Sequence, residues 1–287
     1  MTTIVNDFSF QLTDTGLIIG DDAQVGVPFI DIGSVSGLDN APYRVTKRDH
    51  EGVDGGFIDA EFETGRDITI DGTIYANGQP MEAYLDSLKA NWAPSTTLMP
   101  LYFLNLENGI RMVRVKPLGV HYNWETLRRT GMANVSFSAY AEDPRIYTAT
   151  QQTVTFNVNA TVYSGFGFPL GFSFGFGGVV VTSDGQFVNN AGNRPTPMVM
   201  TIVGACVNPI IICDTTNSTL QFNLTMGVSD TLVIDTQYKT VTLNGANRRS
   251  TLQNPGWFFL QPGNNFVRFR STSGTATMAM VYRAAWR

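Results

Sequence analysis

The chain has 287 residues, of which 43% are hydrophobic and 15% charged, and its net charge is −5. This length is sufficient for two ordinary domains, and the composition is that of a folded chain rather than a disordered one. Neither a stretch of roughly 18 uninterrupted apolar residues nor the basic and apolar regions of a secretory signal occurs in the sequence, so we expect a protein that is neither membrane-inserted nor exported by the general secretion route.

Charge is distributed unevenly along the chain. Residues 1–150 hold 11 Lys and Arg against 20 Asp and Glu (net −9), whereas the remaining residues hold 8 against 4 (net +4). The two halves therefore meet, or tolerate, different electrostatic environments. Chance variation between domains is the alternative explanation.

Short β segments are predicted at the start of the chain. Their alternating apolar residues place them at Ser9 to Ile19, Pro28 to Val35 and Phe57 to Phe62. Between the last two, Lys47 to Gly56 is dense in charge and glycine, which is typical of an exposed hairpin loop.

The stretch from Gly65 to Trp92 predicts a strand that leads directly into a helix. The strand alternates polar residues with a buried face of Ile68, Ile70, Gly72 and Ile74. After a turn at Asn77-Gly78, an apolar stripe at helical spacing follows, made of Met81, Tyr84, Leu85, Leu88 and Trp92. Pro94 ends this helix, because a residue before proline avoids helical backbone angles.

Four further strands are predicted before a domain boundary near Ala141 to Arg145. The first two, Leu98 to Leu106 and Ile110 to Val115, form a hairpin around Asn108-Gly109, a strong hairpin signal. The other two are Val120 to Glu125 and Met132 to Ala141, joined by an exposed basic loop that holds Arg128 and Arg129. We therefore predict an amino-terminal domain at residues 1–148.

The second domain is predicted at residues 149–287 as an antiparallel β-sandwich. Short strands recur there at about the 8 to 12 residue spacing of such folds, at Val179 to Thr182, Gln186 to Asn189, Pro197 to Gly204, Ile210 to Asp214, Thr219 to Leu224, Thr231 to Asp235, Thr240 to Leu243, Trp257 to Leu260, Asn265 to Arg270 and Thr277 to Trp286. A Phe/Gly-rich tract, Ser164 to Gly178, is interpreted as an ordered crossing between the domains within residues 149–180; a low-complexity adhesive element is the alternative.

Candidates for metal or redox chemistry are few. Cys206 and Cys213 are the only cysteines, and His50 and His121 are the only histidines. A zinc site needs three or four thiolate and imidazole ligands, which this spacing does not supply. Two buried free thiols are the simpler interpretation, and a disulfide across the turn at Asn208-Pro209 is the alternative.

The sequence also lacks a convincing catalytic motif. It contains neither a Gly-x-Ser-x-Gly nucleophile elbow nor a phosphate-binding loop. The paired carboxylates Glu61 and Glu63, and Asp67 and Asp71, alternate with apolar residues and are interpreted as the solvated face of a strand rather than as a glycosidase pair. Clustered Lys and Arg of the kind that bind nucleic acid are too few. We predict no enzyme, no metal and no cofactor.

Several short motifs occur in an order that resembles that of one protein family. In the first half these are Ala41-Pro42-Tyr43, Gly65 to Ile74, the helix, and Ala141-Glu142-Asp143-Pro144-Arg145. In the second half they are Asn189 to Asn193, Gly204 with Asn208-Pro209, Ile234-Asp235 with Lys239 to Gly245, and Leu260 to Asn265. Over nearly the whole chain, this order resembles the distal tail protein of long, non-contractile-tailed bacteriophages.

The resemblance implies a structural protein of the virion, located at the phage tail tip and made in the host cytoplasm. In this family the amino-terminal domain is a tail-tube-like β-barrel or sandwich with one flanking helix, and it builds a ring, commonly a hexamer. The galectin-like second sandwich projects outward and carries receptor-binding proteins or side fibres. The implied partners are other copies of the chain, the tail tube protein, the tail hub and the tape measure protein, with DNA passing through without stable binding.

Two surfaces are predicted to mediate contacts. Exposed residues of a long hairpin are candidates for the oligomer interface, namely Lys47, Arg48, Asp49, His50, Glu51 and Asp54. Three aromatic residues, Trp257, Phe258 and Tyr282, are candidates for contact with a partner or a glycan, and burial in the core is their plainer interpretation. The alternatives to a ring protein are a carbohydrate- or receptor-binding minor tail protein, a tail-associated glycan hydrolase, and a hub or tube protein. Finally, the acidity of residues 1–150 predicts a channel that repels phosphate.

Overall fold

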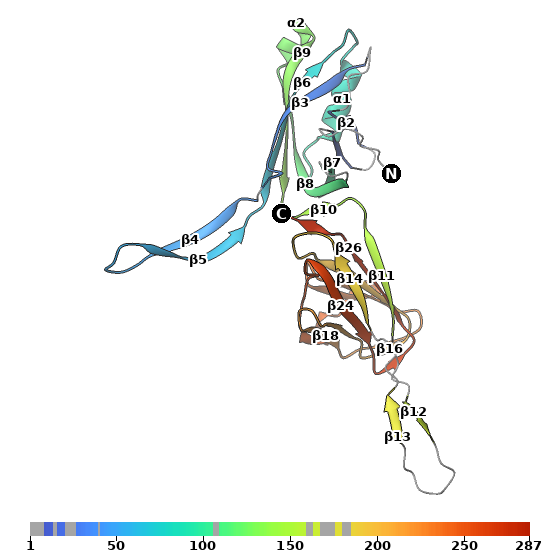
Figure 1. The fold of residues 1–287 in the computed structure, drawn as a ribbon. Coiled ribbons are helices and arrows are strands. Elements are labelled where there is room, and N and C mark those ends of the chain that lie inside the picture. The colour runs from blue at the N-terminus through green and yellow to red at the C-terminus, as the bar shows by residue number, and fades with distance from the viewer. Residues whose placement is uncertain are drawn as a thin grey trace. The chain divides into compact units, whose positions relative to one another are not determined.

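The computed structural model describes residues 9–13, 16–20, 27–39, 41–105, 109–158, 163–166, 176–179 and 185–287. The chain divides into two compact units (Figure 1). Unit 1 comprises residues Met1–Ala149 and Trp286–Arg287, and unit 2 comprises residues Thr150–Ala285. Because the last two residues return to unit 1, unit 2 is an insertion in the chain of unit 1.

Unit 1 is built on one large antiparallel sheet with two α-helices among its described residues. Its elements are β1 (Phe10–Leu12), β2 (Ile18–Ile19), β3 (Phe29–Ser36), β4 (Tyr43–Asp49), β5 (Gly56–Glu63), β6 (Arg66–Tyr75), α1 (Glu82–Asn91), β7 (Met99–Asn105), β8 (Gly109–Tyr122), α2 (Trp124–Thr130), β9 (Met132–Ala141), β10 (Ile146–Thr148) and, where the chain returns from unit 2, β27 (Ala285–Trp286). The sheet order is β2-β1-β7-β8-β9-β6-β3, with β10 paired to β8 and to β27.

The sheet does not close into a barrel. No hydrogen-bonded pairing within the described residues joins its end strands, β2 and β3. The prediction of a mainly β fold is confirmed, but the barrel form of the prediction for this domain is wrong. A barrel needs every strand paired on both sides, and the sequence pattern of a strand does not reveal which neighbours it pairs with.

The predicted strand and helix between Gly65 and Trp92 are confirmed as β6 and α1. Ile68, Ile70 and Ile74 are at most 1% exposed, as the alternation predicts. Leu85, Leu88 and Trp92 of the helical stripe are also buried. The Trp92 ring lies 4.9 Å from the Phe137 ring of β9, centroid to centroid, so α1 covers the core face of the sheet.

The basic loop predicted around Arg128 and Arg129 is instead the helix α2. The Asn123 side chain accepts a hydrogen bond from the Thr126 backbone N–H, which caps the amino terminus. Gly131 ends the helix with φ of 73°, the left-handed angle that favours glycine. Only Leu127 of α2 is buried, so the segment has no apolar periodicity that would have predicted a helix.

Unit 2 is an antiparallel β-sandwich. Its elements are β11 (Gln152–Asn157), β12 (Tyr163–Phe166), β13 (Phe176–Val179), β14 (Gly185–Asn190), β15 (Met198–Val203), β16 (Cys206–Val207), β17 (Ile210–Cys213), β18 (Ser218–Phe222), β19 (Thr225–Met226), β20 (Thr231–Asp235), β21 (Thr240–Leu243), β22 (Ala246–Asn247), the 3-10 turn η1 (Arg249–Thr251), β23 (Leu252–Pro255), β24 (Gly263–Arg270), β25 (Ser273–Gly274) and β26 (Thr277–Tyr282). A six-stranded sheet, β11-β26-β15-β20-β21-β22, and a five-stranded sheet, β14-β24-β17-β18-β23, enclose one core.

The core of unit 2 contains both cysteines and a buried polar set. Cys206 and Cys213 are buried and free, which confirms the simpler interpretation of the thiols.

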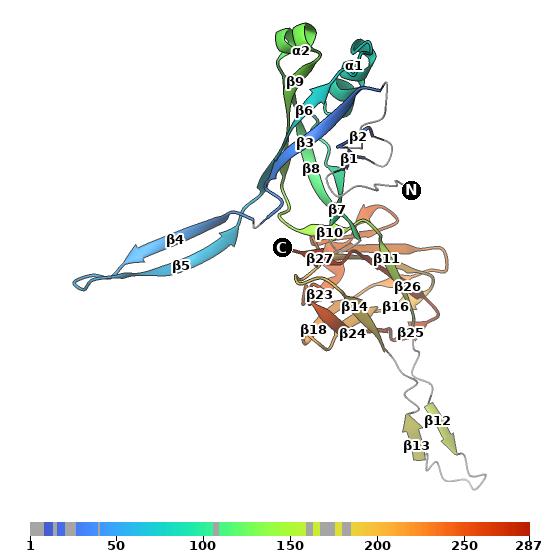
Figure 2. The ribbon, with the colours of Figure 1, turned by 45° about the horizontal axis from the view of Figure 1, so that its top comes forward.

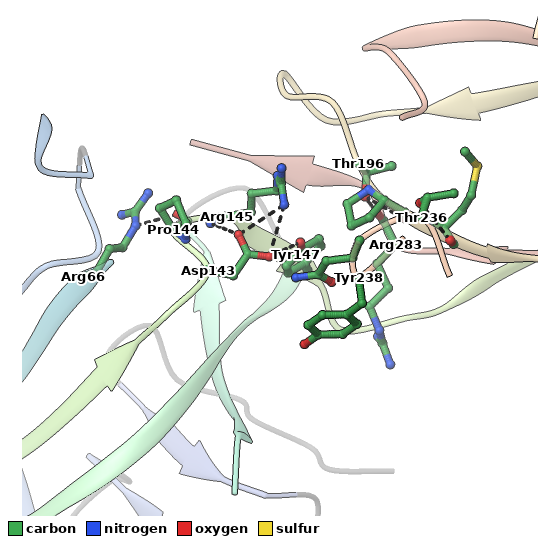
Figure 3. Close-up of polar contacts among 12 residues, drawn as sticks. Arg66, Asp143, Pro144, Arg145, Tyr147, Thr196, Thr236, Tyr238 and Arg283 are labelled. Atoms are coloured by element: carbon green, nitrogen blue, oxygen red, sulfur yellow. Dashed lines mark hydrogen bonds and ion pairs between the residues drawn. The ribbon is translucent and has the colours of Figure 1, made fainter. Parts of the chain in front are cut away.

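Thr196 is fully buried, and its hydroxyl donates to the Arg283 backbone carbonyl at 2.6 Å (Figure 3). The Thr236 hydroxyl likewise donates to the Met198 carbonyl at 2.9 Å. Such hydrogen bonds are necessary because a buried polar group without a partner destabilises the fold.

One predicted strand of unit 2 differs from the structure. Trp257 to Leu260 forms only an isolated bridge, between Leu260 and Thr196. Of the Phe/Gly-rich tract, the described flanks β12 and β13 pair with each other. Its interpretation as an ordered crossing between the domains stays a prediction. Residues 167–175 of that tract lie outside the described residues.

Candidate assembly surfaces

The first candidate surface is the β4–β5 hairpin, which pairs with no other strand of the described chain. Figures 1 and 2 show its two strands running out from the ends of β3 and β6 within unit 1. All seven residues of β4 are exposed, and six of the eight residues of β5 are also exposed. A two-stranded ribbon with both edges and both faces in solvent is marginally stable alone. The edges and faces of the hairpin are therefore available to contact a partner.

The structure places the six predicted interface residues at the outer end of this hairpin. Lys47, Arg48 and Asp49 lie in β4 rather than in a loop, and His50, Glu51 and Asp54 lie in the exposed connection. Arg48 donates to Asp59 across the hairpin at 2.6 Å, and its guanidinium lies 5.7 Å from the Phe57 ring centroid. The charge of Arg48 is thus compensated by Asp59 within the hairpin.

The sequence did not single out the apolar residues of the hairpin. Exposed side chains include Ile58 at 53%, Phe62 at 57% and Val53 at 70%. Tyr43, Val45 and Phe57 are exposed by 37% to 46%. Alternation could have revealed them only if both faces of the hairpin were known to lie in solvent. Aromatic and aliphatic residues exposed together are typical of a surface that is covered by a partner.

The second candidate surface is the face of the β3-β6-β9-β8 sheet opposite the core. The strand registers align Ser34, Asp71, Ser136 and His121 in one row across the four strands. A hollow of about 360 Å³ lies along this row and along Thr73 and Asn134. The acidic residues Asp31 and Asp67 share this face through their registers with Thr73 and Tyr140. The face is largely polar, although Met132 and Tyr140 of β9 are also exposed on it, and its Lys116 is ion-paired with Glu142.

The three predicted aromatic contact residues lie in or against the core of unit 2. Phe258 and Tyr282 are only 4% and 5% exposed, and Trp257 is partly buried and packs on the same core. Tyr282 donates its hydroxyl to the Asn189 carbonyl at 3.0 Å, and burial raises its pKa. The rings of Phe258 and Tyr282 therefore serve packing in this structure and present no open face to a ligand.

A different aromatic pair is exposed on unit 2. Phe187 of β14 is 69% exposed, and its ring lies 4.9 Å from the ring of Phe266 on β24. The Arg268 guanidinium lies 5.2 Å from the Phe266 centroid and is ion-paired with Asp214 at 2.5 Å. No pattern in the sequence indicates this cluster, because the register between β14 and β24 brings the residues together.

No group of three or more His, Cys, Asp and Glu residues in the described ranges is placed to hold a metal ion. Among the helices that the structure describes, none is both long enough and apolar enough to cross a membrane.

Comparisons with known proteins point to one class. Residues 191–286 match the family described as siphovirus-type tail component, C-terminal domain. The fold is similar to the crystal structure of the Dit protein (gp 19.1) of SPP1, at a TM-score of 0.64 and 16% identity, covering 95% of this chain and 98% of the other. That structure is described as a paradigm of the hub adsorption apparatus in phages that infect Gram-positive bacteria.

A chain of the activated phage P2 baseplate with Ca also matches, at a TM-score of 0.48 and 12% identity, over 95% of this chain and 97% of the other. No curated protein matches the sequence. Residues 191–286 therefore match the siphovirus-type tail component, C-terminal domain, and the chain shares the fold of the SPP1 Dit protein over nearly its whole length.

Proposed function

We propose that this chain is a non-enzymatic ring protein of the tail tip or baseplate, which joins the tail tube to the tail hub and to the host-attachment proteins. Unit 1 forms the ring, commonly a hexamer in the family that the sequence resembles, and unit 2 carries receptor-binding proteins or side fibres. The tape measure protein and the DNA occupy the channel, and the DNA passes without stable binding. The observation that carries this proposal is the exposed apolar hairpin on a Dit fold.

The hairpin supports ring formation for a physical reason. A closed ring needs a heterologous interface, in which one surface of each copy meets a different surface of the next. A projecting ribbon with free edges and exposed Ile58, Phe62 and Val53 is suited to reach a neighbour. The charged residues Lys47, Asp49, His50, Glu51 and Asp54 then form the polar rim of that contact.

The polar sheet face supports a channel role. Its row of Ser34, Asp71, Ser136 and His121 offers short, polar side chains to a passing polymer. A cationic surface would bind phosphate, whereas this face carries Asp31, Asp67 and Asp71 and pairs its lysine with a glutamate. We propose that this face lines the channel, so that phosphate is repelled. A ring structure with these carboxylates on the outer wall would contradict the assignment.

The ring is tested by Ile58→Asp. A charge at the centre of an apolar interface is costly to desolvate, so we expect the wild-type chain to form an oligomer near six times 31.5 kDa and the variant to remain monomeric. Light scattering and negative-stain images of the same sample measure this. Val228→Asp is the matched control, because Val228 is 82% exposed on unit 2 and should leave the ring intact. Equal masses for Ile58→Asp and the wild type would contradict the role of the hairpin.

A second candidate function, glycan or receptor binding by unit 2, is favoured by the exposed Phe187 and Phe266 pair. An exposed aromatic platform beside the Arg268 and Asp214 side chains offers stacking together with directional hydrogen bonds. We expect Phe187→Ala to weaken any glycan binding by about tenfold on a glycan array, the loss of roughly 1.4 kcal/mol. Tyr238→Ala, which removes a ring that is 59% exposed elsewhere on unit 2, is the control. If Phe187→Ala leaves glycan binding unchanged, the Phe187 and Phe266 pair is not the glycan contact.

A further inference from the structure

The base of the β4–β5 hairpin contains a fully buried arginine. Arg66, the first residue of β6, is 0% exposed. Its guanidinium donates to the backbone carbonyls of Gly37 at 3.3 Å and Asp39 at 2.5 Å, which lie just before the hairpin. Its Nε atom donates to the Pro144 carbonyl at 2.6 Å (Figure 3). One side chain thus ties the entry of the hairpin to a segment more than 70 residues away in sequence.

The Pro144 segment leads into unit 2. Two contacts link residues within this segment: Asp143 accepts from the Tyr147 hydroxyl at 2.6 Å and pairs with Arg145 at 3.3 Å (Figure 3). Burial lowers the pKa of Arg66, and the carboxylates of Asp39 and Asp143 act in the opposite direction. A guanidinium remains charged in proteins, so these carbonyl contacts are charge-assisted hydrogen bonds, which are stronger than neutral ones.

A second contact joins the other side of the hairpin base to the segment that leaves unit 2. Glu63, the last residue of β5, accepts from the Tyr43 hydroxyl at 2.9 Å. The Arg287 Nε atom lies 3.8 Å from the same Glu63 oxygen. The neighbouring Trp286 lies under the Arg111 guanidinium at 3.8 Å, and its strand β27 pairs with β10. The returning chain end is therefore anchored in unit 1 and touches the hairpin base.

We propose that the base of the β4–β5 hairpin, formed by Arg66 and Glu63 with their partners, is a coupling node. It ties the hairpin to both chain segments that connect unit 1 to unit 2. A partner or load that displaces those segments then also changes the order of the hairpin. The side-chain contacts all join residues of unit 1, and both covalent connections of unit 2 pass through the segments concerned.

Coupling of this kind is reciprocal, because the interaction free energy between two sites is the same from either side. A change at the hairpin base must loosen the connecting segments, and a change in a connecting segment must loosen the hairpin. A contact that only fixes its immediate neighbours would show neither remote effect. Hydrogen–deuterium exchange of the full chain, measured where light scattering shows a monomer, distinguishes the two cases.

The expected results run in both directions. Arg287→Ala should raise amide exchange in residues 43–63 by about threefold, the size expected for a partly exposed ion pair. Tyr43→Phe should raise exchange in β10 and β27 by a similar factor. Arg66→Lys keeps the charge but loses the fork of donors, and it should raise exchange in residues 37–43 and 143–149 together by about tenfold or more.

Two control variants remove arginines that lie outside the proposed node. Arg48→Ala removes the exposed Arg48–Asp59 pair toward the outer end of the hairpin, and it should leave β10 and β27 unchanged. Arg128→Ala removes an exposed arginine of α2 and should leave the hairpin unchanged. If Arg287→Ala and Tyr43→Phe each alter only their own segment, the coupling is overturned. The functional consequence rests on the proposed ring role of the hairpin, but exchange in the monomer can fail or succeed independently of ring formation.

Discussion

Replacing Trp92 with alanine is expected to destabilise unit 1 by about 4 kcal/mol, the typical cost of removing a buried tryptophan side chain. Trp92 is only 1% exposed at the end of α1, and its ring contacts Phe137, which is itself fully buried in β9. Removing the indole leaves a cavity that neither the helix nor the sheet can fill. Because α1 is held to the sheet by this side of the helix, Leu85 and Leu88 also lose support.

The measurement is urea unfolding followed by hydrogen exchange of the β6 and β9 amides, so that the unfolding of unit 1 is monitored by its own residues. Trp124→Ala is the matched control. Trp124 is the same residue type in the same unit, but it is 53% exposed, so its removal should change the free energy of unfolding by less than about 0.5 kcal/mol. A loss below about 1 kcal/mol for Trp92→Ala would contradict the assigned core.

Asn190→Ala is expected to destabilise unit 2 by about 3 kcal/mol, because each buried group left without a hydrogen-bond partner costs roughly 1 to 3 kcal/mol. Asn190 is fully buried, and its amide donates to the carbonyls of Arg194 at 2.7 Å and Leu260 at 3.1 Å. Its side-chain oxygen accepts from the backbone N–H groups of Gly192 at 3.1 Å and Ala285 at 3.4 Å. The Asn190 side chain therefore holds together the turn at residues 190–194, Leu260 of the Thr196–Leu260 bridge, and Ala285.

The adjacent residue supplies the control. Asn189 has the same side chain in the same strand but is exposed, so Asn189→Ala should change the stability of unit 2 by less than about 0.5 kcal/mol. Exchange of the β14 and β24 amides under denaturant measures both variants. Similar losses for the two asparagines would show that the hydrogen bonds of Asn190 do not stabilise this turn.

The sequence by itself determined the elements whose pattern is local. Alternation of Ile68, Ile70 and Ile74 predicted β6, and the stripe that ends at Trp92 predicted α1, because side-chain periodicity reports directly which face is buried. The Asn108-Gly109 signal correctly placed a hairpin between β7 and β8, although the loop itself lies at residues 106–108, outside the described residues. The order of short motifs likewise indicated the tail-protein family, which the match at residues 191–286 supports independently.

Only the tertiary structure decided which residues are exposed, paired or brought together. Phe258 and Tyr282 are core residues while Phe187 is exposed, because side-chain burial depends on which sheet covers each strand. Asn189 and Asn190 are the same residue type in one strand, but successive side chains lie on opposite faces, and only the packing of the sandwich decides which face is buried. The short helix α2 is stabilised by one cap and one buried leucine, so its sequence has no hydrophobic periodicity that could predict a helix. Finally, the contacts of Arg66 and Glu63 join residues remote along the chain, and such pairings arise from topology rather than from local sequence.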